Sequence, residues 1–344
     1  MARQHPLRRF LTAQRRALNP LLILTHDYPD PDAMAGALAL AHLARAAGIR
    51  ATIAHGGIIG RMENRMMAEA LRIPIRRVQA GDWRRCRGVA LVDTQPPFAN
   101  NVFPNATRRA SLVIDHHPRH PDTRAGLIYI RPRCGATATI LARAVLELGR
   151  PVPRRLASAL AYGIASETQN LGREAGAHDV HAYRTLLADA DMRLLGRLQH
   201  PQRSQAFFHT LGRAVHRAFL YRRLIGVHLG PVETPDLISQ VADLLVAYEG
   251  ARWAICTGRF QGHCHISLRT TNPHAEAWKL LVRVVRQQGR AGGHGMIAGG
   301  AVAVGPRATP GAWRRLECEL VRRLCRQFHY PADARPVRPF GGAR

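Results

Sequence analysis

The sequence is poor in lysine, paired cysteines and long apolar segments, and each absence excludes some classes of protein. Lys279 is the only lysine among 50 basic residues, so the net charge of +27 rests on arginines spread along the chain. Such an excess is typical of proteins that attract nucleic acids or other anions. A general arginine-rich composition would give the same basic surface without a dedicated partner. The charge therefore supports a phosphate-rich substrate without establishing one.

The six cysteines contain no C-x-x-C pair. Cys318 and Cys325 lie on one face of an expected helix, where we place them in the core. In His263-Cys264-His265, strand alternation puts the two imidazoles on one face and the thiol on the other, so we do not expect zinc there. Disulfides are not expected either, because the sequence predicts a cytoplasmic protein.

No apolar run approaches the roughly 20 residues that cross a bilayer, so we expect no membrane association. Residues 1–19 are arginine-rich, but they lead into a strand-length apolar run instead of the h-region of a signal peptide. We therefore expect a cytoplasmic protein. The sequence is compatible with a homodimer and leaves the oligomeric state open.

A length of 344 residues suits two domains. Strands expected over 21–25, 50–54, 89–92 and 112–114 alternate with helices over 32–47, 136–148 and 154–165. This alternation predicts an α/β domain with a mostly parallel sheet flanked by helices. We expect an N-terminal arm over 1–20, this domain over 21–195, a helical linker over 196–217, a smaller α/β domain over 218–330 and a flexible tail over 331–344.

In the smaller domain, the pattern predicts strands over 219–229, 252–260 and 263–269, the last two forming a hairpin around Gln261-Gly262. Helices are expected over 201–216, 234–248, 274–286 and 310–328.

Polar side chains follow three apolar runs of the first domain. His26, Asp93 and Asp115 each come at the end of an expected strand. Right-handed crossovers align the carboxyl ends of parallel strands along one edge, so these side chains should converge. A buried strand that ends in carboxylates and imidazoles suits a metal site better than a core.

Two prolines keep the first of these segments extended. In His26-Asp27-Tyr28-Pro29-Asp30-Pro31-Asp32, the prolines disfavour helix and keep the backbone extended. An extended segment can direct the carboxylates of Asp30 and Asp32, two residues apart, at adjacent positions. Mn²⁺ accepts imidazole and carboxylate ligands, and a carboxylate can bridge two ions. The alternative is a solvated loop in which Asp32 is only the N-cap of the next helix. Asp93 and Asp115-His116-His117 at equivalent strand ends favour the metal site.

Two further segments are functional candidates only in combination with this metal site. Glu167 ends an expected helix in a polar turn and, taken alone, is a surface carboxylate. The run from Gly292 to Gly300 suits close backbone approach to an anion, with His294 as a donor and Arg269 gripping the same phosphate. Its alternative is a tight turn. A dinucleotide fingerprint is rejected, because the preceding parallel strand and the later acidic residue are missing.

Taken together, these motifs resemble the DHH phosphoesterases of the subgroup with a C-terminal DHHA1 domain. The matching motifs, in order, are residues 26–32, Asp93, Asp115-His116-His117 and Glu167. The glycine-rich run looks like the DHHA1 signature, and the match covers about residues 20–305. The subgroup includes RecJ-like exonucleases, nano-RNases that also dephosphorylate phosphoadenosine phosphate, and cyclic-dinucleotide phosphodiesterases.

The resemblance implies a two-metal site with Mn²⁺, for which Mg²⁺ or Co²⁺ could substitute. One ion would be held by His26, Asp30 and Asp93. The second would be held by Asp32, Asp93, His116 and Glu167, with Asp93 as the bridge.

The resemblance also implies catalytic and substrate-binding roles. Asp93 and Asp115 would support catalysis, Asp115 by orienting its neighbours, and His117 would face the scissile phosphate. The other end of the nucleotide would be held by Arg269, Gly292, Gly293, His294 and Gly295.

The function so implied is hydrolysis of short oligonucleotides, phosphoadenosine phosphate or cyclic dinucleotides by a hydroxide that two metals activate. One position departs, because the family usually has aspartate where this chain has Glu167. A nucleotide- or nucleic-acid-binding protein with impaired catalysis is therefore one alternative. A pyrophosphatase or exopolyphosphatase on the same metal site is another.

Overall fold

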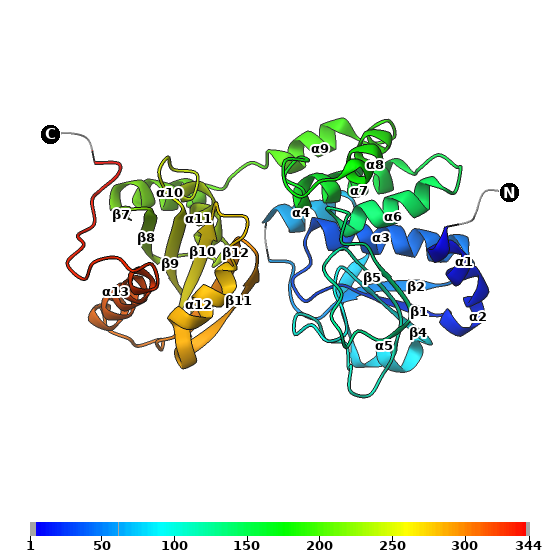
Figure 1. The fold of residues 1–344 in the computed structure, drawn as a ribbon, viewed down its shortest axis with the longest axis horizontal. Helices are drawn as coiled ribbons and strands as arrows, with labels where there is room; N and C mark the ends of the chain where they lie inside the picture. Colours follow the sequence, from blue (N-terminus) through cyan, green and yellow to red (C-terminus); the bar gives the residue numbers. More distant parts are fainter. Residues whose placement is uncertain (1–4, 61, 342–344) are drawn as a thin grey trace. The chain divides into compact units, whose positions relative to one another are not determined.

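The computed structural model describes residues 5–60 and 62–341. The chain divides into two compact units, Met1–Gln202 and Arg203–Arg344 (Figure 1). Each unit contains a six-stranded sheet with its own hydrophobic core. The predicted class, an α/β domain with a parallel sheet followed by a smaller α/β domain, is confirmed.

The sheet of the first unit is entirely parallel, in the order β3-β2-β1-β4-β5-β6. Its strands are β1 Leu21–Leu24, β2 Ala51–His55, β3 Ile75–Arg77, β4 Gly88–Val92, β5 Ala110–Asp115 and β6 Ala125–Ile130. Sequence patterning identified the four central strands. The edge strands β3 and β6 were missed. β3 contains a single apolar residue, and the apolar run of β6 was not recognised as a strand.

Helices cover both faces of this sheet. Figure 1 shows α3, α6 and α7 on one face and α5 on the other. The helices are α1 Pro6–Ala13, α2 Arg15–Leu18, α3 Pro31–Ala46, α4 Met62–Ala70, α5 Ala80–Arg85, α6 Thr137–Leu146, α7 Arg154–Glu167, α8 Ala177–Leu187 and α9 Met192–Gln199. Most of their buried apolar residues belong to one core cluster with β1, β4 and β5.

A glycine lets α7 pass close to the start of α3. A Cβ added to Gly163 would lie 2.9 Å from the Cβ of Ala35 and 3.0 Å from the carbonyl oxygen of Pro31. The first distance is shorter than real Cβ contacts and the second is tight, so a side chain at this position would force the two helices apart. This contact fixes the carboxyl-terminal half of α7 against the beginning of α3.

The sheet of the second unit is mixed, in the order β11-β12-β10-β9-β8-β7, with β8 and β9 parallel. Its strands are β7 Phe219–Tyr221, β8 Leu224–Pro231, β9 Trp253–Phe260, β10 His263–Thr270, β11 Gly289–His294 and β12 Ile297–Ala303. Its helices are α10 Gln205–Arg217, α11 Asp236–Leu245, α12 Ala277–Val285, the short 3-10 helix η1 Arg286–Gln288 and α13 Pro310–Gln327.

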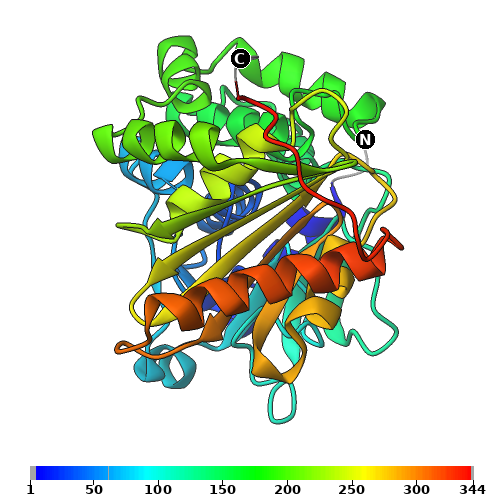
Figure 2. The ribbon, with the colours of Figure 1, turned by 90° about the vertical axis from the view of Figure 1, so that its left-hand side faces the viewer.

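Helices α12 and α13 share a core cluster with one face of this sheet, and α11 shares another with the opposite face. Figure 2 shows α13 lying across the fanned strands. The predicted hairpin at Gln261-Gly262 is confirmed, since β9 and β10 pair antiparallel around these residues. The strand expected over 219–229 is instead a hairpin of β7 and β8, with Arg222 in the left-handed region at φ 53°.

The glycine-rich segment is mostly strand. Gly292 pairs with Gly299 and Gly293 with Ala298 in the β11–β12 hairpin, which turns at Gly295-Met296. Many N–H and C=O groups of this segment are therefore hydrogen-bonded within the sheet. This agrees with the alternative of a tight turn better than with a backbone that is free to bind an anion. The tail is also more ordered than expected, because Val337 exchanges two backbone hydrogen bonds with Leu220.

Within residues 5–60 and 62–341, no helix has both the length and the apolar character that a bilayer crossing requires.

His5 anchors the amino-terminal helix to the sheet. Its side chain is 5% exposed, and its Nδ1 accepts a hydrogen bond from the backbone N–H of Leu7 at 3.3 Å. Its Nε2 lies 3.3 Å from the hydroxyl of Tyr129 on β6. Burial, with the nearby Arg143, lowers the pKa of His5 to about 4.

The free energy of unfolding should therefore decrease as the pH falls, because His5 is neutral in the folded protein. An unfolded imidazole takes up its proton near pH 6.5, whereas the folded one stays neutral until about pH 4, so acid favours unfolding. Between pH 6.5 and 5.0, the native protein should lose roughly 1.5 kcal/mol more stability than the variant His5→Asn, in which the Asn side chain can still cap α1. Chemical denaturation at both pH values measures this, and parallel losses would contradict it.

Candidate metal centre

Five polar side chains meet at the carboxyl edge of the parallel sheet. His26 follows β1, Asp93 follows β4, and His116 and His117 follow β5. Asp30 joins them as the N-cap of α3, where its Oδ1 accepts the N–H of Ala33 at 3.0 Å. The predicted convergence of strand ends is therefore present in the structure.

Asp93 belongs to two sets of donors. His26, Asp30 and Asp93 can direct one donor atom each to a common point, and so can Asp93, His116 and His117. Nε2 of His26 lies 3.6 Å from Oδ2 of Asp93, and Nε2 of His116 lies 3.6 Å from its Oδ1. The two oxygens of one carboxylate thus face two separate imidazoles.

The spacing suits ligands arranged around cations. At 3.6 to 4.0 Å, most of these N···O pairs are too long for hydrogen bonds. Metal–ligand bonds of about 2.1 Å place neighbouring ligand atoms roughly 3 to 3.4 Å apart, so a small contraction completes either set. Nε2 of His116 is buried and has no hydrogen-bond partner in the described part of the chain, and a cation would satisfy it.

Negative charge is crowded at this edge. Burial raises the pKa of Asp93 well above its ordinary value, and the carboxylates of Asp30, Asp115 and Glu167 raise it further. A divalent cation would relieve this repulsion and keep the carboxylates ionised. The backbone of Asp93 also adopts a left-handed conformation at φ 60°, a strain that commonly accompanies functional positions. The donor set therefore fits a pair of divalent cations.

Asp32 connects two helices at this edge. It is buried, and its two oxygens accept the backbone N–H groups of Thr137 at 2.8 Å and Ala138 at 2.6 Å at the start of α6. The N-cap alternative for Asp32 is wrong, since Asp30 caps α3. Oδ2 of Asp32 lies 4.0 Å from Nε2 of His116, and its binding of a cation stays a prediction.

Asp115 orients His117. The carboxylate of Asp115 is fully buried, and its Oδ1 lies 2.9 Å from Nδ1 of His117. Burial lowers the pKa of His117, but the hydrogen bond and charge of Asp115 outweigh it and raise the value to about 9. The imidazole is therefore protonated at neutral pH in this structure, with 39% of its side chain exposed.

Two residues that support the site were not identified from the sequence. Gln95 is buried and donates to Oδ2 of Asp115 at 2.8 Å, while its Oε1 accepts from the backbone of His120 and the hydroxyl of Thr123. Thr137 donates to Oδ1 of Asp93 at 2.9 Å. The position of Gln95, two residues after Asp93, was the available signal.

Glu167 ends α7 and is paired with an arginine. Nη2 of Arg173 lies 3.1 Å from Oε1 of Glu167 and donates to its backbone carbonyl at 2.7 Å. Burial and the charge of Asp30 raise the pKa of Glu167 to about 7, against the opposing effect of Arg173. The second donor set contains His117, which the resemblance assigned to the phosphate, in place of Asp32 and Glu167.

The predicted substrate-binding residues lie in the second unit. Arg269 is 5% exposed, and its Nε lies 2.5 Å from Oδ1 of Asp243 on α11. Its Nη1 donates to the carbonyl of Leu268 at 3.1 Å. These contacts differ from the predicted phosphate grip and make Arg269 a buried ion-pair partner. The side chain of His294 lies outside the described part of the structure.

Part of the first unit is similar to a known protein family. Residues 20–164 match the model of the DHH family, N-terminal domain. The uncharacterized protein MJ1633 of Methanocaldococcus jannaschii is 33% identical over 287 residues, which are 83% of this chain and 58% of the relative. The chain thus spans little more than half the length of that relative.

One solved structure shares the fold, and a second is partly similar. An exopolyphosphatase-related protein from Bacteroides fragilis superposes with a TM-score of 0.73 at 13% identity, covering 92% of this chain and 96% of that one. RecJ from Thermus thermophilus, solved with Mg²⁺, gives a TM-score of 0.47 at 16% identity over 96% of this chain and 53% of its own. The first of these shows the common fold.

Replacing the shared carboxylate should disrupt both donor sets. Asp93→Asn keeps the shape of the side chain and removes its charge. Since outer-shell changes already weaken metal binding about 10- to 100-fold, this change should weaken Mn²⁺ binding at least about 100-fold. Isothermal titration measures affinity and stoichiometry. Asp189→Asn, in an exposed turn after α8, is the matched control and should bind as the native protein does.

Releasing Glu167 should strengthen metal binding. Arg173→Gln removes the cation that pairs with the carboxylate and increases the local negative charge. Arg173 lowers the pKa of Glu167, so its loss raises this pKa above about 7. At pH 8 Mn²⁺ should still bind several-fold more tightly, because it then competes with a proton and no longer with the guanidinium group. Unchanged affinity in the same titration would show that the ion pair does not compete with the metal.

Proposed function

The chain carries a DHH family N-terminal domain over residues 20–164, and from this premise we propose that it is a metal-dependent phosphoesterase acting on short oligonucleotides or nucleotides. The observation that carries the proposal is the shared carboxylate of Asp93, whose Oδ2 faces His26 and whose Oδ1 faces His116. One carboxylate between two donor sets is suited to holding two cations side by side.

We propose Mn²⁺ as the metal, because a mixture of imidazole and carboxylate ligands suits it. His26, Asp30 and Asp93 would hold one ion. Asp93 and His116 would hold the other, with Asp32 and Glu167 beside them. Bound divalent cations supply Lewis acidity, lower the pKa of coordinated water towards neutrality and offset charge on phosphate oxygens.

The chain contributes proton transfer and positioning. Asp115 keeps His117 protonated, and the partly exposed imidazole can donate to a phosphate or leaving oxygen. Gln95 holds the second oxygen of Asp115 and so fixes the orientation of the pair. Asp32 anchors the starts of α3 and α6 together, which keeps the donors of α3 in place.

The substrate class rests on charge and on the second unit. A net charge of +27 attracts polyanions to the protein surface. The second unit is proposed to be a DHHA1-type domain whose glycine-rich hairpin contributes to nucleotide binding. Short oligonucleotides, phosphoadenosine phosphate and cyclic dinucleotides are the proposed substrates of a cytoplasmic enzyme.

One contact favours a second candidate function. The pairing of Glu167 with Arg173 occupies a carboxylate that the two-metal scheme needs. If this pair persists in the presence of Mn²⁺, the chain would bind nucleotides with little or no hydrolysis. A pyrophosphatase or exopolyphosphatase activity would use the same donors and differs in substrate alone.

Hydrolysis assays separate these functions. Purified protein with Mn²⁺ should release mononucleotides from di- to pentanucleotides, or products from phosphoadenosine phosphate or cyclic di-AMP, faster than phosphate from pyrophosphate. Asp93→Asn should lower turnover at least about 1,000-fold, since it removes a ligand from both proposed cations, and Asp189→Asn should not. Substantial Mn²⁺-dependent turnover in Asp93→Asn would refute the assignment, and binding without turnover in the native protein would favour the second candidate.

A further inference from the structure

One cavity of the first unit lies away from the metal centre. It has a volume of about 720 Å³, within the range of roughly 300 to 1,000 Å³ that small-molecule sites occupy. Residues of α3, β2, β3 and the start of α7 line it. Arg45 follows Asp32 by 13 residues on α3, which at 1.5 Å per residue separates them by about 20 Å.

Uncompensated positive charge surrounds this cavity. Arg45, Arg72, Arg76 and Arg155 line it, and its described lining contains no carboxylate. Arg76 is neutralised by Asp82, which accepts two hydrogen bonds from it at 2.6 and 2.8 Å. Arg155 donates to the backbone carbonyl of Arg72, which leaves its charge unbalanced. Within the described residues, no ion pair or hydrogen bond engages the side chain of Arg45.

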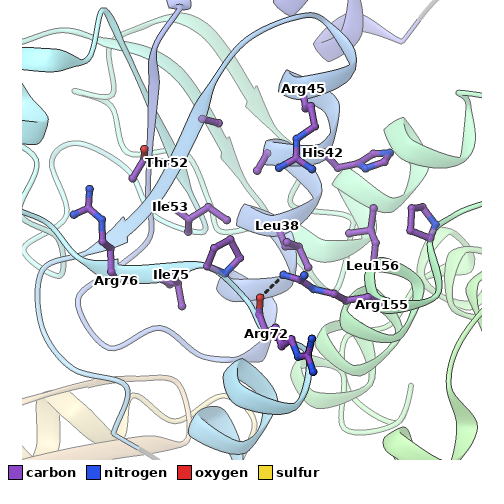
Figure 3. A pocket seen from close by; sticks show the side chains of 14 residues that line it. Leu38, His42, Arg45, Thr52, Ile53, Arg72, Ile75, Arg76, Arg155 and Leu156 are labelled. Carbon is purple, nitrogen blue, oxygen red and sulfur yellow. Dashed lines mark hydrogen bonds between the residues drawn. The ribbon is translucent and has the colours of Figure 1, made fainter.

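The floor of the cavity is apolar. Figure 3 shows the guanidinium groups of Arg45 and Arg155 near a centre formed by Leu38, Ile53 and Ile75. Burial, with the nearby charge of Arg45, lowers the pKa of His42 on the same rim. A ligand that satisfies this site carries an anionic group for the arginines and an apolar or flat body for the floor.

We propose that this cavity, called here the arginine cavity, binds a phosphate monoester with an apolar or flat body, of the mononucleotide class. Guanidinium groups match phosphate oxygens bidentately, and the planar groups can also stack on a base. Arg45, which would hold the phosphate, lies about 20 Å along α3 from Asp32, so the anion would be bound away from the metal centre. Binding there is independent of whether the chain hydrolyses nucleotides.

Isothermal titration in EDTA tests this site without the metal centre. The native protein should bind 5′-AMP at one site per chain, and inorganic phosphate and adenosine should each bind at least about 10-fold more weakly, because each lacks half of the recognised group. Asp93→Asn should bind 5′-AMP as the native protein does. Equal affinity for inorganic phosphate, no binding of 5′-AMP, or loss of binding in Asp93→Asn would overturn the proposal.

Paired variants distinguish the cavity from the general basic surface. Arg45→Gln with Arg155→Gln should weaken 5′-AMP binding at least about 10-fold, because two contacts to the phosphate are lost. Arg184→Gln with Arg193→Gln removes the same charge from exposed positions on α8 and α9 and should change affinity less than about twofold. Equal weakening in both pairs would overturn the proposal. The single variant Arg45→Gln, with circular dichroism to verify folding, should show the same direction of change.

Discussion

The structure of the first unit depends on keeping several carboxylates close together at one sheet edge. Burial and mutual repulsion raise the pKa values of Asp32, Asp93 and Glu167, so the cluster opposes its own ionisation. Hydrogen bonds from the start of α6 and from Thr137 offset part of this cost. Nε2 of His116 finds no hydrogen-bond partner among residues 5–60 and 62–341, and the positive charge of a bound cation would balance these groups.

Much of this arrangement follows from the sequence, because parallel strands leave their polar ends on a common edge. His26, Asp93 and His116 could be placed together from strand order alone. The ion pairs of Glu167 and Arg269 could not be predicted in this way. Arg173 reaches Glu167 across a turn containing several residues with positive φ, and Asp243 reaches Arg269 from a helix 26 residues earlier. Such partners depend on backbone paths that periodicity does not encode.

The glycine-rich run shows a second limit of sequence patterns. Glycine permits close approach of any partner, and in this chain the partner is the neighbouring strand of the β11–β12 hairpin. A run of glycines therefore indicates that another group approaches the backbone closely, but it does not show whether that group is a ligand or a neighbouring strand. The edge strand β3 was missed for a different reason, since its three residues include two arginines and show no apolar pattern.

The crossing at Gly163 has a consequence for how the chain tolerates change. The position has no side chain and no place among the donor sets, yet any larger residue would push α7 away from Pro31 and Ala35. That displacement would carry Glu167 outward and tilt the segment that presents Asp30 and Asp32. A complete substitution scan should therefore find Gly163 as intolerant of replacement as the charged residues of the metal centre.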